Sequence, residues 1–361
     1  MKPTKVLFML PYPLNESPSQ RFRLEQYLDF MASKGLKPHT QSFLPPGSWR
    51  LFYSKGYILR KAQMLLNGYI KRIMLLLSIA GFDFVFIHRE AAPIGPPVFE
   101  WLIARMFGKK IIYDFDDAIW LTDKKNEGRL ERSLRSRNKV ASICKWSYKI
   151  SCGNEYLRQY AQQFNPNAVL NPTTIDAENL HNPARYRVGK NSDRIVVGWT
   201  GSHSTLKYLY LLQGVLQKIQ HDHPHVDLLI IADRRPEIQF ERLTFKYWTR
   251  ETEITDLLLA DIGIMPLPND PWALGKCGFK ALQYMALEIP AVVSAVGVNN
   301  IIIENERNGF LCSRDEDWLE ALDRLIEDAV LRKQTGQAGR QTVIDNYSVT
   351  SNSSDFLSLF E

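Results

Sequence analysis

The sequence is poor in cysteine, has no long apolar run and, over one stretch, has no acidic residue. Its four cysteines are far apart and form no C-x-x-C pair, which argues against a disulfide framework or zinc knuckle and favours a reducing cytoplasm. The best candidate for a membrane span, Ile73–Ala80, has only eight residues, and Val6–Leu10 is too short for a signal peptide. These absences predict a cytoplasmic protein without a membrane span.

Acidic residues are absent from residues 30–82, which contain eight Lys or Arg. The whole chain has a net charge of +6, so the rest of it is net negative and the basic character is local. Over 49–74 the cations alternate with aromatic and aliphatic residues, and no nucleic-acid-binding motif is present, so we expect no nucleic-acid partner. The residues are Trp49, Arg50, Phe52, Tyr53, Lys55, Tyr57, Arg60, Lys61, Tyr69, Lys71 and Arg72.

Three interpretations of this basic segment remain open. A helix that lies on an anionic membrane surface would use both its cations and its apolar residues, and we favour it. The alternatives are a core helix with a solvated basic face, and an electropositive rim that attracts a phosphorylated acceptor.

The composition is that of a globular protein with two domains. With 361 residues, of which 45% are hydrophobic and 23% charged, the chain is not disordered, collagenous or a coiled coil. Short apolar runs such as Phe82–His88 alternate with amphipathic stretches, which predicts an α/β fold of two Rossmann-like, doubly wound parallel sheets. We expect domains over 1–180 and 194–344, a polar linker over 181–193, and a C-terminal helix, 345–361, that packs back on the first domain.

The strongest motif is a glycine-containing loop that leads into a helix, GKCGFKALQYMALEIP at 275–290. Lys276 and Lys280 lie just before and within the first helical turn, where a cation interacts unfavourably with the helix dipole. A phosphate bound at Gly278 and the first backbone N–H groups would reverse that balance. The motif therefore predicts a phosphate site, and the alternative is that both lysines point into water.

A second loop of small residues follows the strand predicted at 194–200. Gly201 permits close backbone approach, and Ser202 supplies a hydroxyl donor or cap. This order of strand, loop and helix also predicts phosphate binding, against the alternative of residues that only cap the helix.

Residues 245–312 resemble the C-terminal domain of the GT-B glycosyltransferases of the family-4 type, the glycosyl transferases group 1. The likeness is carried by LQYMALEIPAVVS and by VGVNNIIIENERNGFL, in which Glu304 matches a glutamate of the family's run. The two glutamates of the family's E-x7-E motif fall on Gly275 and Gln283, so this sequence departs from it at both positions.

This resemblance implies how the C-terminal domain binds a nucleotide-diphosphate sugar. Gln283 is expected to hydrogen-bond the ribose, and Lys207 to contact the diphosphate. Gly275 offers only its backbone where the family has a carboxylate. Trp248 lies in the region of the base-binding loop, where it either stacks on the base or simply packs.

The N-terminal half carries a weaker resemblance at two predicted strand ends. His88 ends the first, in the family's I-H-x-x-x-x-P run, and Asp114 and Asp116 end the second, where the family has a catalytic-site histidine. We predict that Asp116, Asp114 and His88 face the reacting sugar or the acceptor. The alternatives are that Asp117 caps a helix, that His88 is a structural strand-end residue, and that D-x-D binds a divalent cation. We discount the cation because D-x-D alone is a weak signal, so no metal is expected.

Two arginines follow the first strand, Arg21 and Arg23, in what is predicted to be the first turn of a helix. By the same dipole reasoning they are predicted to contact a phosphate of the donor or acceptor, unless they are surface charges.

The resemblance thus implies a hexosyltransferase-like glycosyltransferase that retains the anomeric configuration and needs no cofactor beyond its UDP-, GDP- or dTDP-linked donor. We expect a glycan or lipid-linked acceptor in cell-envelope or exopolysaccharide synthesis, and a cytoplasmic protein peripheral to the inner face of the plasma membrane. The alternative is a catalytically silent GT-B protein that binds a nucleotide sugar or a partner glycosyltransferase, which the two departures from E-x7-E support.

Overall fold

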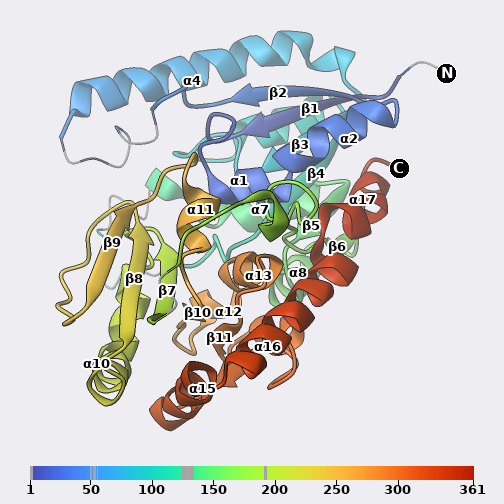
Figure 1. Ribbon diagram of the computed structural model, residues 1–361. Helices are drawn as coiled ribbons and strands as arrows, with labels where there is room; N and C mark the ends of the chain where they lie inside the picture. Colours follow the sequence, from blue (N-terminus) through green and yellow to red (C-terminus); the bar gives the residue numbers. More distant parts are fainter. Residues whose placement is uncertain are drawn as a thin grey trace. The chain divides into compact units, whose positions relative to one another are not determined.

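The chain folds into two compact units, each built on a six-stranded parallel sheet (Figure 1). The computed structural model describes residues 3–48, 51, 54, 56–122, 128, 134–190 and 193–361. Unit 1 comprises Met1–Thr173, Gly275–Cys277 and Asn352–Glu361, and unit 2 comprises Thr174–Leu274 and Gly278–Ser351. The predicted α/β class with two doubly wound parallel sheets is confirmed.

The sheet of unit 1 has the strand order β2-β1-β3-β4-β5-β6, and every neighbouring pair is parallel. Strands β1 and β3 are almost wholly buried, as their continuous apolar runs predict for a sheet covered on both faces. The chain order reverses between β1 and β3, which marks this point at the carboxyl edge of the sheet as a favoured ligand site. The strands are β1 (Lys5–Leu10), β2 (Lys37–Ser42), β3 (Phe84–His88), β4 (Lys110–Phe115), β5 (Lys149–Cys152) and β6 (Ala168–Leu170).

The helices of unit 1 differ in one instructive place from the prediction. The single helix expected over 19–33 is broken at Leu24, whose φ of −146° is not helical. Arg23 and Leu24 are buried at the break, and α1 also buries Gln20, Arg21 and Phe22 before it. The helices are α1 (Pro18–Arg23), α2 (Leu28–Ser33), α4 (Ile58–Ser78), α5 (Val98–Trp101), α7 (Lys139–Trp146) and α8 (Glu155–Gln162).

Residues 352–361, which include most of α17 (Val349–Ser358), pack on the core of unit 1 through aromatic rings. Phe356 stacks on Tyr27 with ring centroids 4.1 Å apart. Phe360 lies against Phe8 of β1 and Phe86 of β3, at 6.2 and 6.3 Å. The last ten residues of the sequence therefore complete the core of the N-terminal sheet.

The sheet of unit 2 has the order β12-β11-β10-β7-β8-β9, again all parallel, and its chain order reverses between β7 and β10. The segment expected to be a linker belongs to this unit. His181 is completely buried, and Lys190 donates to the carbonyl of Ala260 at 2.8 Å. The strands are β7 (Ile195–Gly201), β8 (Val226–Ala232), β9 (Leu243–Tyr247), β10 (Ile262–Met265), β11 (Ala291–Ser294) and β12 (Phe310–Cys312). The helices are α9 (Leu206–Leu209), α10 (Gln213–Asp222), α11 (Glu253–Leu257), α12 (Pro271–Leu274), α13 (Phe279–Ala286), α14 (Asn299–Ile302), α15 (Asp315–Glu327) and α16 (Ala329–Thr342).

Helix α4 corrects two expectations about the basic segment. Ile58–Gly81 is long and apolar enough to cross a membrane by length and composition, with a mean hydropathy of 1.3, although no such stretch was expected. Arg72, which was counted among the cations for a membrane surface, is completely buried. Five of the other predicted surface residues lie outside the described part of the chain: Trp49, Arg50, Phe52, Tyr53 and Lys55.

Arg72 anchors α4 to the carboxyl edge of the first sheet. Its guanidinium donates to the carbonyls of Leu10 in β1, Gln41 in β2 and Ala91 after β3, at 2.7, 3.0 and 2.8 Å. Burial lowers the pKa of Arg72 to about 9, while nearby Glu100 acts in the opposite direction. The Arg72 side chain therefore supplies hydrogen-bond donors to three backbone carbonyls that helix α4 would otherwise bury without a partner.

We expect Arg72→Met to lower the free energy of unfolding by about 3 kcal/mol or more, because three buried carbonyls lose their donor together. Urea denaturation followed by circular dichroism measures the change. The neighbouring Lys71→Met, at an exposed position of the same helix, is the matched control and should shift stability by less than about 0.5 kcal/mol. Equal effects of the two substitutions would contradict the anchoring role.

Candidate functional site

In unit 2, the two predicted phosphate-binding loops follow adjacent strands. Gly201 ends β7, and the loop that leads to α13 follows β10, its neighbour in the sheet. Tyr284 of α13 connects them, since its hydroxyl accepts a hydrogen bond from the N–H of Thr200 at 3.0 Å and lies 3.3 Å from the carbonyl of Ile264. The structure thus brings both loops together at the reversal point of the sheet, where ligands of doubly wound folds bind.

Helix α13 begins at Phe279 because Gly278 takes a left-handed conformation before it, with φ +68°. A Cβ atom at Gly278 would lie 2.3 Å from Cδ1 of Ile302, so a side chain is excluded by space as well as by conformation. Lys280, in the first turn, places its ammonium 5.8 Å from the ring centroid of Trp199 in β7. A cation and a helix N-terminus therefore lie together beside the end of β7.

The loop after β7 is closed by its own hydroxyl groups. The N–H of Ser202 donates to Oγ1 of Thr205 at 3.1 Å, and the hydroxyls of Ser202 and Ser204 lie 2.8 Å apart. Lys207, in α9, lies with its ammonium 5.2 Å from the ring of Tyr208. These hydroxyl contacts lie within the loop, and no side chain caps the start of α9.

Trp248 directly follows β9, a strand that was not expected in this region. Its N–H donates to the carbonyl of Ala232, the last residue of β8, at 2.9 Å. Trp248 is half-buried and lies at the same carboxyl edge of the sheet as the two loops.

Gln283, expected to bind ribose, is buried and lies against a carboxylate. Its Nε2 is 3.3 Å from Oε1 of Glu253 in α11 and 3.3 Å from Nε2 of His181. The amide of Gln283 therefore lies beside a carboxylate, the group that the resemblance leads one to expect at position 283 itself. The structure adds Glu253 to the candidate residues.

Glu304 is separated from these groups. It lies in the turn that leads into β12, where Asn308 Oδ1 accepts from its N–H and Arg307 forms an exposed ion pair with its carboxylate at 2.6 Å. The same turn reaches the start of β11, because a Cβ atom at Gly309 would lie 2.9 Å from the carbonyl of Ala291. A strand begins at the opposite edge of a parallel sheet from where it ends, so Glu304 lies towards the amino edge.

Gly275 and Lys276 belong to unit 1. Gly275 is the first of the two positions that the sequence resemblance assigns to the E-x7-E motif. A Cβ atom at Gly275 would lie 2.7 Å from both Cβ and N of Ala118, so no glutamate side chain fits there. Lys276 places its ammonium 2.7 Å from Oδ1 of Asp117. The lysine predicted to contact phosphate is thus paired with a carboxylate in this structure.

Unit 1 gathers its charged candidates around Asp114, which is completely buried at the end of β4. Arg23 forms an ion pair with Oδ1, Ser151 donates to the same oxygen at 2.6 Å, and Nδ1 of His88 lies 2.7 Å from Oδ2. Burial alone would raise the pKa of Asp114, but Arg23 and His88 outweigh it and hold the pKa below its usual value. Asp114 and Arg23 are therefore buried partners, and Arg23 is not the surface phosphate contact that was expected.

Asp116 and Asp117 share one guanidinium, that of Arg89. Arg89 donates to Oδ1 of Asp116 at 2.7 and 3.0 Å and to Oδ2 of Asp117 at 2.7 Å. Burial raises the pKa of Asp116, but Arg89, His88 and Arg23 together lower it well below the usual range. A carboxylate so firmly ionised is a poor proton acceptor, and it suits electrostatic or hydrogen-bonding contact with a substrate better.

His88 and Ser19 continue the network away from Asp114. Because Asp114 is held ionised, Nδ1 of His88 carries the proton that Asp114 accepts, and Nε2 lies 2.9 Å from Oγ of Ser19. Ser19 belongs to α1, which follows β1, so the contact crosses the reversal point of the sheet. Arg21, on the same helix, is buried with its guanidinium 5.0 Å from the ring of Phe22.

Three candidate residues were not predicted from the sequence: Ser19, Arg89 and Glu253. Arg89 had a usable signal, since it directly follows His88 in β3, and three aspartates lie at or just after the end of β4, the neighbouring strand. Ser19 and Glu253 had none, because their partners lie 69 and 30 residues away. Within the described residues, no group of three or more His, Cys, Asp or Glu is placed to hold a metal ion.

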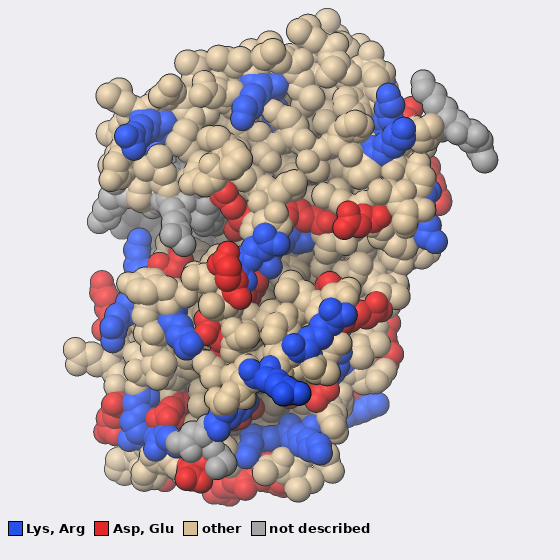
Figure 2. All heavy atoms as spheres, turned by 45° about the horizontal axis from the view of Figure 1, so that its top comes forward, with Lys and Arg blue, Asp and Glu red and all other residues tan. Residues whose placement is uncertain are grey.

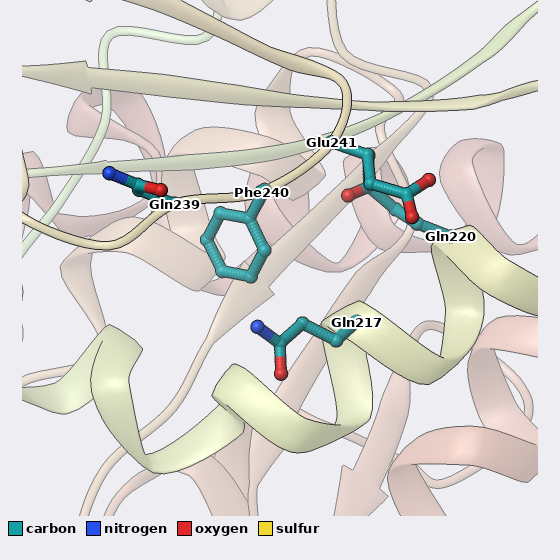
Figure 3. Close-up of a pocket in the computed structure, with 5 residues that line it drawn as sticks. All are labelled: Gln217, Gln220, Gln239, Phe240 and Glu241. Carbon is teal, nitrogen blue, oxygen red and sulfur yellow. The ribbon is translucent and has the colours of Figure 1, made fainter.

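A pocket of about 200 Å³ lies elsewhere in unit 2, between α10 and residues 239–241 (Figure 3). These two segments lead into β8 and β9, so the pocket lies at the amino edge of the sheet. None of the predicted site residues lines it; the lining residues are Gln217, Gln220, Gln239, Phe240 and Glu241.

Residues 194–328 match the family model described as glycosyl transferases group 1. This part of the chain is therefore similar to the glycosyl transferases group 1. The matched residues cover the loop after β7, the start of α13 and the buried Gln283, which is the part of the chain where the sequence resemblance was strongest. The match supports a transferase enzyme. Among curated proteins, none matches the sequence significantly.

Solved structures share the fold of this chain over nearly its whole length. Sucrose-phosphate synthase from Thermosynechococcus elongatus has a TM-score of 0.75 and 13% identity, covering 99% of this chain and 98% of its own. Anabaena Alr3699/HepE, solved in complex with UDP, has a TM-score of 0.65 and 12% identity, covering 99% of both chains. WaaG, a glycosyltransferase involved in lipopolysaccharide biosynthesis, has a TM-score of 0.62 and 14% identity, covering 98% and 99%. These likenesses show that the two units form the predicted GT-B fold.

We expect Asp114→Asn to destabilise the protein by about 3–5 kcal/mol at pH 7, because Arg23 would stay buried without a counter-charge. The folded pKa of Asp114 lies below that of the unfolded chain, near 3.9. Its stabilisation is therefore complete above about pH 5 and declines as the pH falls below about 4. The difference in the free energy of unfolding between wild type and Asp114→Asn should therefore become smaller as the pH falls below about 4.

Urea denaturation at a series of pH values from neutral to acid measures this difference. Asp355→Asn, at an exposed position of α17, is the control and should change stability by less than about 0.5 kcal/mol. A difference between wild type and Asp114→Asn that does not depend on pH would show that the buried charge is not the cause.

Proposed function

We propose that the protein transfers a sugar from a nucleotide-diphosphate donor to a glycan or lipid-linked acceptor, with retention at the anomeric carbon. The observation that carries the proposal is the start of α13, where Lys280 and the helix N-terminus meet the end of β7 at the reversal point of the second sheet. A helix N-terminus and a neighbouring cation attract the two phosphates of such a donor and stabilise them as they leave. The UDP and UDP-glucose complexes of Anabaena Alr3699/HepE support this donor class.

Donor recognition is assigned to residues of unit 2. The diphosphate is held at Gly278 and Lys280, with help from Gly201, Ser202 and Lys207. Gln283 contacts the ribose, and Glu253 orients the amide of Gln283 from 3.3 Å. Trp248 stacks on the base.

The reacting groups are assigned to the ionised residues of unit 1. Asp116, held by Arg89, is partly exposed and offers a fixed negative charge to the sugar or to the oxocarbenium-like charge that develops on it. Asp114 pairs with Arg23 and His88, which together with Arg89 lower the pKa of Asp116. No residue in this scheme requires a metal ion or an organic cofactor.

The acceptor belongs, in this proposal, to cell-envelope or exopolysaccharide synthesis at the cytoplasmic face of the plasma membrane. The apolar and basic residues of α4 in unit 1 support an acceptor that is presented at a membrane. A catalytically silent protein that binds the same donor remains the second candidate. The observation that favours it is the absence of a carboxylate at Gly275, where Ala118 leaves no room for one.

Donor hydrolysis separates the two candidates. We expect purified wild-type protein to hydrolyse at least one of a series of UDP-, GDP- and dTDP-linked sugars, and NMR of the released sugar to show the original anomeric configuration. Asp116→Asn should lower kcat about a hundredfold and leave donor affinity within about twofold, since its charge acts mainly in the transition state. A wild-type protein that binds a donor without turnover would establish the silent candidate instead.

Lys280→Ala tests the phosphate site directly. We expect affinity for the nucleoside diphosphate to fall about tenfold, roughly 1.4 kcal/mol, in isothermal titration calorimetry. Lys333→Ala, at an exposed position of α16 in the same unit, is the charge-matched control and should bind as wild type does. Unchanged affinity in Lys280→Ala would mean that the nucleotide does not bind at the start of α13.

A further inference from the structure

Helix α4 presents two opposite faces. One is buried on unit 1 and repeats every four residues, through Met64, Gly68 and Arg72. The other face is a stripe of apolar residues. Successive members are seven, four, three and four residues apart in the sequence, which places them along one side of an α-helix about 31 Å long. The stripe consists of Leu59, Leu66, Ile70, Ile73 and Leu77, each between 45% and 86% exposed.

Basic side chains flank this stripe. Arg60 and Lys71 lie on the same flank, about a third of a turn from the centre of the stripe, and both are exposed. No acidic residue occurs anywhere between residues 30 and 82. Figure 2 shows the surface over α4 as tan with separated blue side chains. The face is thus apolar in its centre, and its only charges are positive.

We infer that the leucine and isoleucine stripe of α4 docks on an anionic lipid bilayer, with the helix lying in the plane of the interface. The five apolar side chains enter the boundary between headgroups and acyl chains, while Arg60 and Lys71 contact anionic headgroups. Arg72, completely buried, takes no part in lipid contact. The inference deepens the proposed function and rests on it only for the acceptor's place at a membrane.

Charge favours a bilayer over a second copy of the chain as the occupant of this face. A two-fold dimer would bring the stripe of one copy against the stripe of the other. Arg60 and Lys71 would then lie near the same cations of the second copy, and α4 has no acidic residue to pair with them. Anionic headgroups supply the missing charge. The bonds of Arg72 to β1, β2 and the end of β3 also hold α4 on the sheet, which a helix crossing the bilayer would have to abandon.

Co-sedimentation with vesicles tests the inference. We expect the full-length protein to bind vesicles of phosphatidylglycerol and phosphatidylcholine in equal parts, to bind pure phosphatidylcholine at least tenfold more weakly, and to be released by raised salt. The double variant Leu66→Glu and Ile73→Glu should lose binding to the mixed vesicles at least tenfold. Arg60→Gln with Lys71→Gln should weaken binding to the mixed vesicles about tenfold and leave binding to pure phosphatidylcholine unchanged.

Leu211→Glu is the matched control, because Leu211 is a leucine of unit 2 that is 52% exposed. It should bind the mixed vesicles as wild type does. Circular dichroism and binding of the nucleoside diphosphate, measured on every variant without vesicles, establish that each is folded. A variant that loses vesicle binding but still binds the nucleotide tests the docking face alone. Wild-type protein that binds no nucleotide would contradict the proposed function and leave the docking inference standing.

Four results would overturn the inference. They are wild-type binding that does not depend on lipid charge, vesicle binding that survives in the Leu66→Glu and Ile73→Glu variant, protein that resists extraction by salt and alkali as a spanning helix does, and a concentration-dependent dimer that this double variant abolishes.

Discussion

Asp114 and Arg23 are buried as a pair at the carboxyl edge of the first sheet, where an isolated charge would cost several kcal/mol. Their contacts join α1, β3, β4 and β5, because Ser151 and His88 complete the coordination of the carboxylate. His88, whose Nδ1 lies 2.7 Å from Asp114, places its Nε2 2.9 Å from Ser19. The ionised state of Asp116 depends first on Arg89, and His88 and Arg23 add to it. The fold positions the reactive edge of unit 1 through electrostatics as much as through apolar packing.

Sequence patterns predicted the two parallel sheets because strands that are buried on both faces have continuous apolar runs, as β1 and β3 show. They did not predict β9 or the break at Leu24. Strand β9 has only half-buried and exposed residues and lies at the edge of its sheet. The break at Leu24 has no local sequence signature. Among the site residues, the glycines and lysines near α13 had a local signature. The assignment of Arg23 to Asp114, 91 residues away, required the tertiary structure.

The two positions that the sequence resemblance assigns to the E-x7-E motif, Gly275 and Gln283, lie in different surroundings. At Gly275 the backbone lies so close to Ala118 that a side chain is excluded, so the carboxylate could not be kept without moving β4's following turn. At Gln283 an amide replaces the carboxylate, but Glu253 places another carboxylate 3.3 Å from it. The second position has therefore kept a hydrogen-bonding pair with acidic character, while the first has lost its side chain altogether. The proposed donor site would therefore depend on backbone groups, Lys280 and the pair of Gln283 with Glu253.

The cations of the basic segment have two different roles in the structure, one internal and one at the surface. Arg72 contributes to the net charge of this segment but satisfies three carbonyls inside unit 1, so it acts on the position of α4 and not on any partner. Arg60 and Lys71, which remain exposed, flank a stripe of apolar side chains. By fixing the buried face of α4, Arg72 determines which face is left outside, and an internal hydrogen-bonding residue thereby sets the orientation of the external apolar surface. Helix α4 thus connects the carboxyl edge of the sheet, where Arg72 donates to the carbonyls of Leu10 and Gln41, to an exposed apolar stripe. The proposed membrane docking and the position of the sheet edge therefore depend on one structural element.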